Sequence, residues 1–161
     1  AEKTFQLVTQ VAGRTGRGEK AGLVMVQTFS PEHPSIACAS QHNYEAFSSM
    51  ELQQRAKFGY PPHGYLARII MRGPDQTEAE GFAESFVRRL QATRQSQSAE
   101  CRILGPAPPP LYKLRGKFRF HAILQASDAA VLNRLIVKTV ADIKPPKEVQ
   151  FVIDIDPVDT L

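Results

Sequence analysis

The stretch KFRFHAILQA, residues 117–126, decides the fold, because apolar and polar side chains alternate along it. Its apolar positions are Phe118, Phe120, Ala122 and Leu124. Its polar positions include Lys117, Arg119 and His121. A period of two is that of a β-strand with one buried face. We therefore predict a strand that packs on a core with one face and presents cations on the other.

The residues on either side of this strand predict a complete α/β domain. Asp75 and Asp128 are expected helix N-caps, and Glu78 follows Asp75 at the spacing of a capping box. A polar loop is expected over 93–99. The predicted elements are, in order, a strand at 65–72, a helix at 75–90, strands at 101–106 and 117–126, a helix at 128–143 and a strand at 149–157. This order predicts an α+β, split βαβ (ferredoxin-like) fold, with a four-stranded antiparallel sheet and two helices on one face.

The residues that precede this domain predict a separate segment. A helix is expected over 2–12, a buried β-strand over 23–29, and a second helix over 42–59. We divide the chain into an N-terminal segment at 1–30, a linker with a helix at 31–63, and an α/β domain at 64–161.

Composition and charge narrow the class of protein. The 161 residues are 42% hydrophobic, which excludes an intrinsically disordered chain. Neither a signal peptide nor a membrane-spanning run is recognisable, and the two cysteines form no metal pair, so a cytoplasmic protein is expected. The net charge of +4 is concentrated, because residues 101–127 contain no acidic residue whereas 128–161 contain more acids than bases. Such a basic stretch attracts polyanions.

The glycine-rich stretch at residues 10–17, QVAGRTGR, is the sharpest motif. It is not a P-loop, because Glu19 follows Gly18 where a lysine is needed, and it lacks the last glycine of a dinucleotide-binding loop. Two arginines on a glycine-framed turn can instead reach the phosphates of a nucleotide bound by another domain. The alternative is an exposed basic turn that ends a helix.

This motif resembles motif VI of superfamily-two helicases. The flanking stretches ELQQRAKFGYPPHGYLARI, ILGPAPPPLYKLRGKFRFHAIL and FVIDIDPVDTL resemble the C-terminal region of the PriA family, primosomal protein N′. This family consists of bacterial ATP-dependent 3′→5′ DNA helicases that restart stalled replication forks. The resemblance implies that residues 1–30 are the remnant of a RecA-like helicase lobe and that a ribosomal-protein-like α/β domain follows.

The resemblance also implies roles for individual residues and ligands. Gln10, Arg14 and Arg17 would act on the ATP γ-phosphate as catalytic residues, with Gly13, Arg14 and Arg17 at the nucleotide. ATP and Mg²⁺ are implied for the full-length protein, as is zinc, which this fragment would not bind. The sequence contains no Walker A lysine and no DExH box. We therefore expect the chain by itself neither to hydrolyse ATP nor to unwind DNA.

The basic strand supplies a second candidate site. Lys113, Arg115, Lys117, Arg119 and His121 are interleaved with aromatic residues, a pattern typical of nucleic-acid binding. The resemblance implies forked or single-stranded DNA, the acidic tail of the single-stranded-DNA-binding protein and other primosome proteins as partners, in the bacterial cytoplasm at the nucleoid, with no membrane. Open alternatives are a solvated sheet face, a free-standing nucleic-acid-binding split βαβ module without motor activity, and a protein–protein adaptor.

Overall fold

The computed structural model describes residues 1–15, 23–141 and 143–157. The chain forms two compact units, Ala1–Arg55 and Ala56–Leu161. The first unit contains helices α1 (Glu2–Arg14) and α2 (Pro34–Ser40) and most of α3 (Tyr44–Phe58). Its small core consists of Phe5, Cys38, Ala39 and Phe47.

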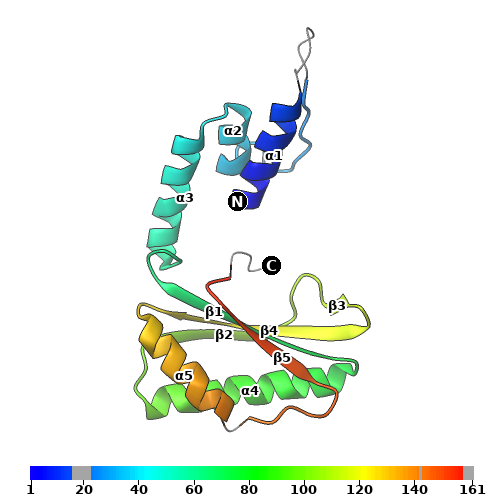
Figure 1. Cartoon of the computed structure of the whole chain (residues 1–161), viewed down its shortest axis with the longest axis vertical. Helices are drawn as coiled ribbons and strands as arrows, with labels where there is room; N and C mark the ends of the chain where they lie inside the picture. Colours follow the sequence, from blue (N-terminus) through cyan, green and yellow to red (C-terminus); the bar gives the residue numbers. More distant parts are fainter. Residues whose placement is uncertain (16–22, 142, 158–161) are drawn as a thin grey trace. The chain divides into compact units, whose positions relative to one another are not determined.

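The second unit is the predicted antiparallel α+β domain (Figure 1). Its elements are β1 (Tyr65–Gly73), α4 (Gln76–Ser96), β2 (Cys101–Ala107), β3 (Lys113–Leu114), β4 (Lys117–Ala126), α5 (Ala129–Ala141) and β5 (Gln150–Ile155). The sheet order is β2-β4-β1-β5, and the short β3 pairs with β4. All pairs are antiparallel, so the split βαβ prediction is confirmed.

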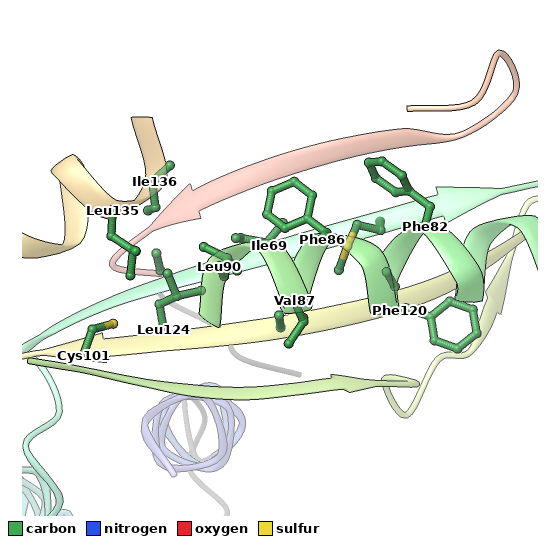
Figure 2. Close-up of a cluster of buried hydrophobic side chains, with 14 of the residues drawn as sticks. Ile69, Phe82, Phe86, Val87, Leu90, Cys101, Phe120, Leu124, Leu135 and Ile136 are labelled. Carbon is green, nitrogen blue, oxygen red and sulfur yellow. The ribbon is translucent and has the colours of Figure 1, made fainter. Parts of the chain in front are cut away.

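Helices α4 and α5 cover one face of the sheet and enclose the core with it (Figures 1 and 2). Phe86 and Leu90 of α4 and Leu135 of α5 are fully buried against Ile69 and Leu124 of the sheet. Burial alternates along β1 and β4, so the residues between the core positions lie on the opposite face. We call that side, away from α4 and α5, the open face.

The helix starts form as predicted from their aspartates. Asp75 accepts a hydrogen bond from the Glu78 backbone N–H at 2.9 Å and caps α4. Asp128 accepts one from the Ala130 N–H at 2.8 Å at the start of α5. Each cap satisfies an N–H group that has no partner within its own helix.

The predicted buried strand at 23–29 is wrong. These residues have no regular secondary structure, and Leu23, Met25 and Phe29 are almost fully exposed. An apolar run with β-branched residues becomes a buried strand only where a neighbouring strand accepts its hydrogen bonds. All strands in the described part of the chain lie in the second unit.

The predicted loop at 93–99 is wrong over its first half, because α4 continues to Ser96. Thr93 is buried in this last turn, and Arg94 Nη1 donates to the carbonyl oxygen of Cys101 at 3.3 Å. These tertiary contacts hold polar residues in a helix although they lack apolar periodicity. The seven-residue helix α2, which begins at Pro34, was not predicted either.

Candidate nucleic-acid interface

The motif residues of the first unit lie at the end of α1. Gln10 and Arg14 are exposed and one helical turn apart, so both side chains lie on one side of the helix. Gly13 is also exposed, and a Cβ atom at this position would meet no other atom within 4 Å. Arg17 lies outside the described residues. The accessible Gln10 amide and Arg14 guanidinium groups fit contact with nucleotide phosphates, where they would donate hydrogen bonds.

The open face of the second unit gathers cations from two strands. On β4 it presents Lys117, Arg119 and His121, as the alternation predicts. On β1 it presents Arg68 and Arg72, because these residues alternate with the core residues Ile69 and Met71. The pairing of β1 with β4 therefore brings the cations of both strands together.

The strand register aligns the central members of this group. Arg119 of β4 lies directly opposite Arg72 of β1, which in turn lies opposite Gln150 of β5. Lys117 Nζ donates a hydrogen bond to Gln150 Oε1 at 3.1 Å. We call Lys117, Arg119, Arg72 and Gln150 the basic row. It spans three neighbouring strands.

The hairpin between β3 and β4 supports the basic row at one end. Its turn contains Arg115 (φ 50°) and Gly116 (φ 77°), both left-handed, as two-residue hairpin turns require. Arg119 donates from its backbone N–H to Tyr112 O at 2.8 Å and from Nη1 to Leu111 O at 3.3 Å. These bonds fix the direction of the Arg119 side chain.

The predicted basic residues are divided between the hairpin and the open face. Lys113 and Arg115 are exposed on the hairpin, whereas Lys117, Arg119 and His121 are half-buried on the open face. The aromatic residues lie elsewhere. Phe120 is buried, and Tyr112 packs edge-on against Phe118 and Phe120. Phe118, predicted on the buried face, is half-buried, with Lys113 Nζ 4.3 Å from its ring centre.

Burial and two neighbouring arginines, one of them in the basic row, lower the pKa of His121. Burial lowers the pKa of His121 below its ordinary value, and the positive charges of Arg68 and Arg119 lower it further. Arg68 is partly neutralised by Asp154 of β5, which accepts from its Nη2 at 3.1 Å. A bound anion would offset the positive field at His121.

The opposite end of the open face is closed by the domain's own chain. Gln125 Nε2 donates to the carbonyl oxygens of Phe58 and Gly59, which precede β1. Asp156 accepts from the Leu66 N–H at 2.9 Å and donates its own N–H to Leu66 O at 2.8 Å. Leu66 is consequently buried, although it lies on the open face. The accessible polar end is the one with the basic row.

Sequence reasoning missed the contribution of β1. Arg68 and Arg72 are four residues apart and therefore share one face of a strand, which is a readable signal. The register that places Arg72 opposite Arg119 depends on two strands far apart in sequence. A single stretch does not reveal that register.

The remaining histidines and acids do not form a metal centre in the part of the chain that the structure describes. Within residues 1–15, 23–141 and 143–157 no three His, Cys, Asp or Glu side chains are grouped to hold a metal ion. Asp154 and Asp156 serve instead as hydrogen-bond partners of β1. The described helices include none that is long and apolar enough to cross a membrane.

Comparison with known proteins identifies the domain. Residues 56–158 match the model of the primosomal protein N C-terminal domain. The chain belongs to the PriA family. Its 161 residues correspond to the C-terminal region of that family, and the matched range agrees with the second compact unit.

Individual PriA relatives match over nearly the whole chain. The replication restart protein PriA of Bacillus subtilis is 36% identical over 160 residues, which are 98% of this chain and 20% of the relative. The proteins of the same name from Synechocystis sp. and Treponema pallidum are 33% and 32% identical, over 98% and 100% of this chain and 18% and 24% of their own lengths. The chain thus spans about a fifth of the length of the curated relatives it matches.

Proposed function

We propose that this chain is the C-terminal part of an ATP-dependent 3′→5′ DNA helicase that binds stalled forks and restarts replication. The name of the relatives, replication restart protein PriA, supports this role. Within the whole protein, the second unit is the DNA-binding part. The first unit supplies arginines to a nucleotide site completed by other parts of the protein, in the cytoplasm at the nucleoid.

The observation that carries the DNA-binding proposal is the basic row. Three cationic side chains from β1 and β4 share one side of the sheet, and Gln150 adds an amide next to them. Arginine and lysine side chains donate hydrogen bonds to phosphate oxygens, and their clustering on one face is the electrostatic footprint of a nucleic-acid-binding protein.

The nucleotide part of the proposal rests on α1. Gln10 and Arg14 lie on one exposed side of this helix, and Gly13 leaves space beside them. ATP with Mg²⁺ would supply the phosphoryl group whose charge these residues, with Arg17, stabilise. Zinc belongs in this proposal to parts of the full-length protein beyond the chain described here.

The DNA-binding proposal is tested with the double variant Lys117→Ala/Arg119→Ala. Binding of a fluorescein-labelled forked DNA is measured by anisotropy at several salt concentrations. We expect weaker binding, and a slope of log K against log salt that falls by about two, because two phosphate contacts are lost. Lys138→Ala on α5, away from the open face, is the control and should bind as the unmodified chain does. Equal affinity and slope for all three proteins would reject the proposal.

A second candidate ligand is the acidic tail of the single-stranded-DNA-binding protein. The observation that favours it is that Val152 and Leu104, both on the open face, are 47% and 41% exposed. Apolar side chains near cations suit a peptide with acidic and apolar residues. Competition between such a peptide and forked DNA for the unmodified chain tests this candidate, and no competition with no peptide binding would exclude it.

A further inference from the structure

We propose that the basic row recognises the sugar–phosphate backbone of double-stranded DNA and does not stack on bases, with the Arg72–Arg119 pair as its central phosphate clamp. This inference rests on the proposed function and deepens it, because it names the form of nucleic acid that the open face takes and adds a residue, Arg72, that the sequence patterns did not indicate.

Two like charges lie in register on neighbouring strands. Opposite residues of an antiparallel pair have Cα atoms only about 4.5–5.5 Å apart. Arg72 and Arg119 occupy such positions and point to the same side of the sheet. Like charges directly opposite each other destabilise a sheet. An anion bound beside the two arginines would lower this repulsion. It would accept hydrogen bonds from Arg72 and from the N–H groups of Arg119 other than the one that donates to Leu111 O.

The neighbours of the Arg72–Arg119 pair extend the clamp. Lys117 is two residues before Arg119 on β4, which places its Cα about 6.8 Å further along the strand. Its ammonium group is held by Gln150, which lies opposite Arg72. The cations are therefore arranged in two directions, along β4 and across to β1. A surface of this kind contacts successive phosphates of a backbone.

The aromatic residues on either side of Arg119 offer no platform for bases. The exposed rings of Phe58 and Tyr60 belong to the segment at the opposite end of the open face, where Gln125 binds the Phe58 carbonyl oxygen. Base stacking in single-strand binding needs exposed aromatic faces. Phe120 is 4% exposed, and Phe118 is covered by Lys113 and Tyr112. Between the cations, β1 and β5 present aliphatic Ile70 and Val152. The ring of His121 is half-buried.

The experiment compares three DNA ligands with the 161-residue chain. They are a 20-base-pair duplex, one of its strands alone, and a single strand of the same length made of abasic sites. We expect the duplex to bind most tightly and the two single strands to bind equally, because base removal takes away no contact. A change of duplex sequence should alter the affinity less than twofold.

The variants Arg72→Gln and Arg119→Gln test the clamp. Each should weaken duplex binding about tenfold and reduce the salt slope by about one, whereas Lys138→Gln should change neither. The midpoint of urea unfolding should stay the same or rise for Arg72→Gln, because like-charge repulsion is removed. Arg119→Gln also loses the hydrogen bond to Leu111 O, so for this variant a cooperative transition is the evidence of an intact fold. This readout distinguishes a lost contact from a lost fold.

The possible outcomes test duplex-backbone recognition and the proposed DNA binding separately. Tighter binding of the base-containing strand than of the abasic strand, or duplex binding unaffected by Arg72→Gln, overturns the inference and leaves DNA binding intact. Failure to bind any of the three DNAs overturns the proposed function and the inference with it. If none of the three DNAs binds and an acidic peptide binds saturably, the basic row is assigned to a protein partner.

Discussion

His121 lies on the open face of the sheet, where burial and the charges of Arg68 and Arg119 lower its pKa. The neutral form of the imidazole is therefore favoured over the charged form more strongly than in a free histidine. A bound phosphate opposes the field of the two arginines and raises the pKa, so binding takes up a proton. Asp154, which is paired with Arg68, is the acidic group on this part of the face.

We expect the affinity for duplex DNA to rise a few-fold as the pH falls from 8 to 5.5. The rise begins where the pH passes through the pKa that His121 has in the DNA-bound state. His121→Gln should remove most of this dependence. Anisotropy titrations across the pH range measure it, with the exposed His63→Gln as the matched control. An identical pH profile for His121→Gln and the unmodified chain would contradict the assignment.

The same histidine makes the free energy of unfolding depend on pH in the opposite sense, because stability falls as the pH falls. A folded-state pKa below the unfolded value means that the unfolded chain binds more protons between the two values. The contribution of His121 to stability is therefore present above the unfolded pKa and is lost as pH falls through the folded pKa.

At the residue scale, the sequence predicts which face of the sheet a side chain occupies when this depends only on its own strand. The alternation from Phe120 to Leu124 correctly separates core from open face, since burial follows a period of two. Arg72 shows why the rest was not predictable. Its importance comes from Arg119 on a strand about fifty positions away in the chain, and only the register brings the two together.

At the scale of the element, strand β2 contains an irregularity that only glycine accommodates. The register with β4 shifts between Leu104 and Ala107, and Gly105 lies between them with φ +100°. A Cβ atom there would be 2.7 Å from the carbonyl oxygen of His121. The backbone of β2 therefore approaches β4 more closely than a side chain allows.

We predict that Gly105→Ala lowers the free energy of unfolding by about 2 kcal/mol or more, through the strained φ and the contact with His121 O. Gly81→Ala is the matched control. Gly81 is inside α4 and its Cβ position is open, so alanine should stabilise by about 0.5–1 kcal/mol. Urea unfolding followed by circular dichroism measures both. A destabilised Gly81→Ala, or an unchanged Gly105→Ala, would refute this account.

Elements whose residues match their own helical or strand period were predictable, and those that depend on tertiary partners were not. Helix α4 shows both cases. Its apolar face and Asp75 cap are local features, whereas its last turn depends on the contact of Arg94 with β2. The stretch 23–29 has the composition of a buried strand without a neighbouring strand in the described structure, and so remains exposed.

At the scale of the whole molecule, the second unit contains its entire main core. Every residue of that core lies between Ala67 and Ile153. Among the described residues of the first unit, the core consists of a few side chains around Phe5 and Phe47, whose rings stack 4.4 Å apart. The two units are thus unequal in the burial that stabilises them.

We predict that residues 56–161, produced alone, unfold in one cooperative transition and retain the duplex affinity of the longer chain within about threefold. Thermal unfolding and anisotropy measure these properties. Residues 1–55 alone should show a broad transition, because so small a core offsets little conformational entropy. Loss of the cooperative transition in 56–161 would show that the second unit depends on the first.

The order of elements made the architecture of the second unit predictable from the sequence alone, because a split βαβ order with two amphipathic helices can form few compact folds. The position of the boundary between the two units was harder to predict from the sequence. It falls near the end of α3, a helix whose sequence continues without a break from one unit into the next.

The packing of Tyr112 against Phe118 and Phe120 has an optical consequence. The chain contains no tryptophan, and its other three tyrosines, Tyr44, Tyr60 and Tyr65, are exposed. Tyr44 and Tyr60 each have one tilted ring contact, whereas Tyr112 has two edge-on ring contacts, and its carbonyl oxygen accepts from Arg119. Near-ultraviolet circular dichroism of this unlabelled protein therefore includes a signal from the aromatic cluster that adjoins the basic row, and Tyr112→Phe identifies that signal.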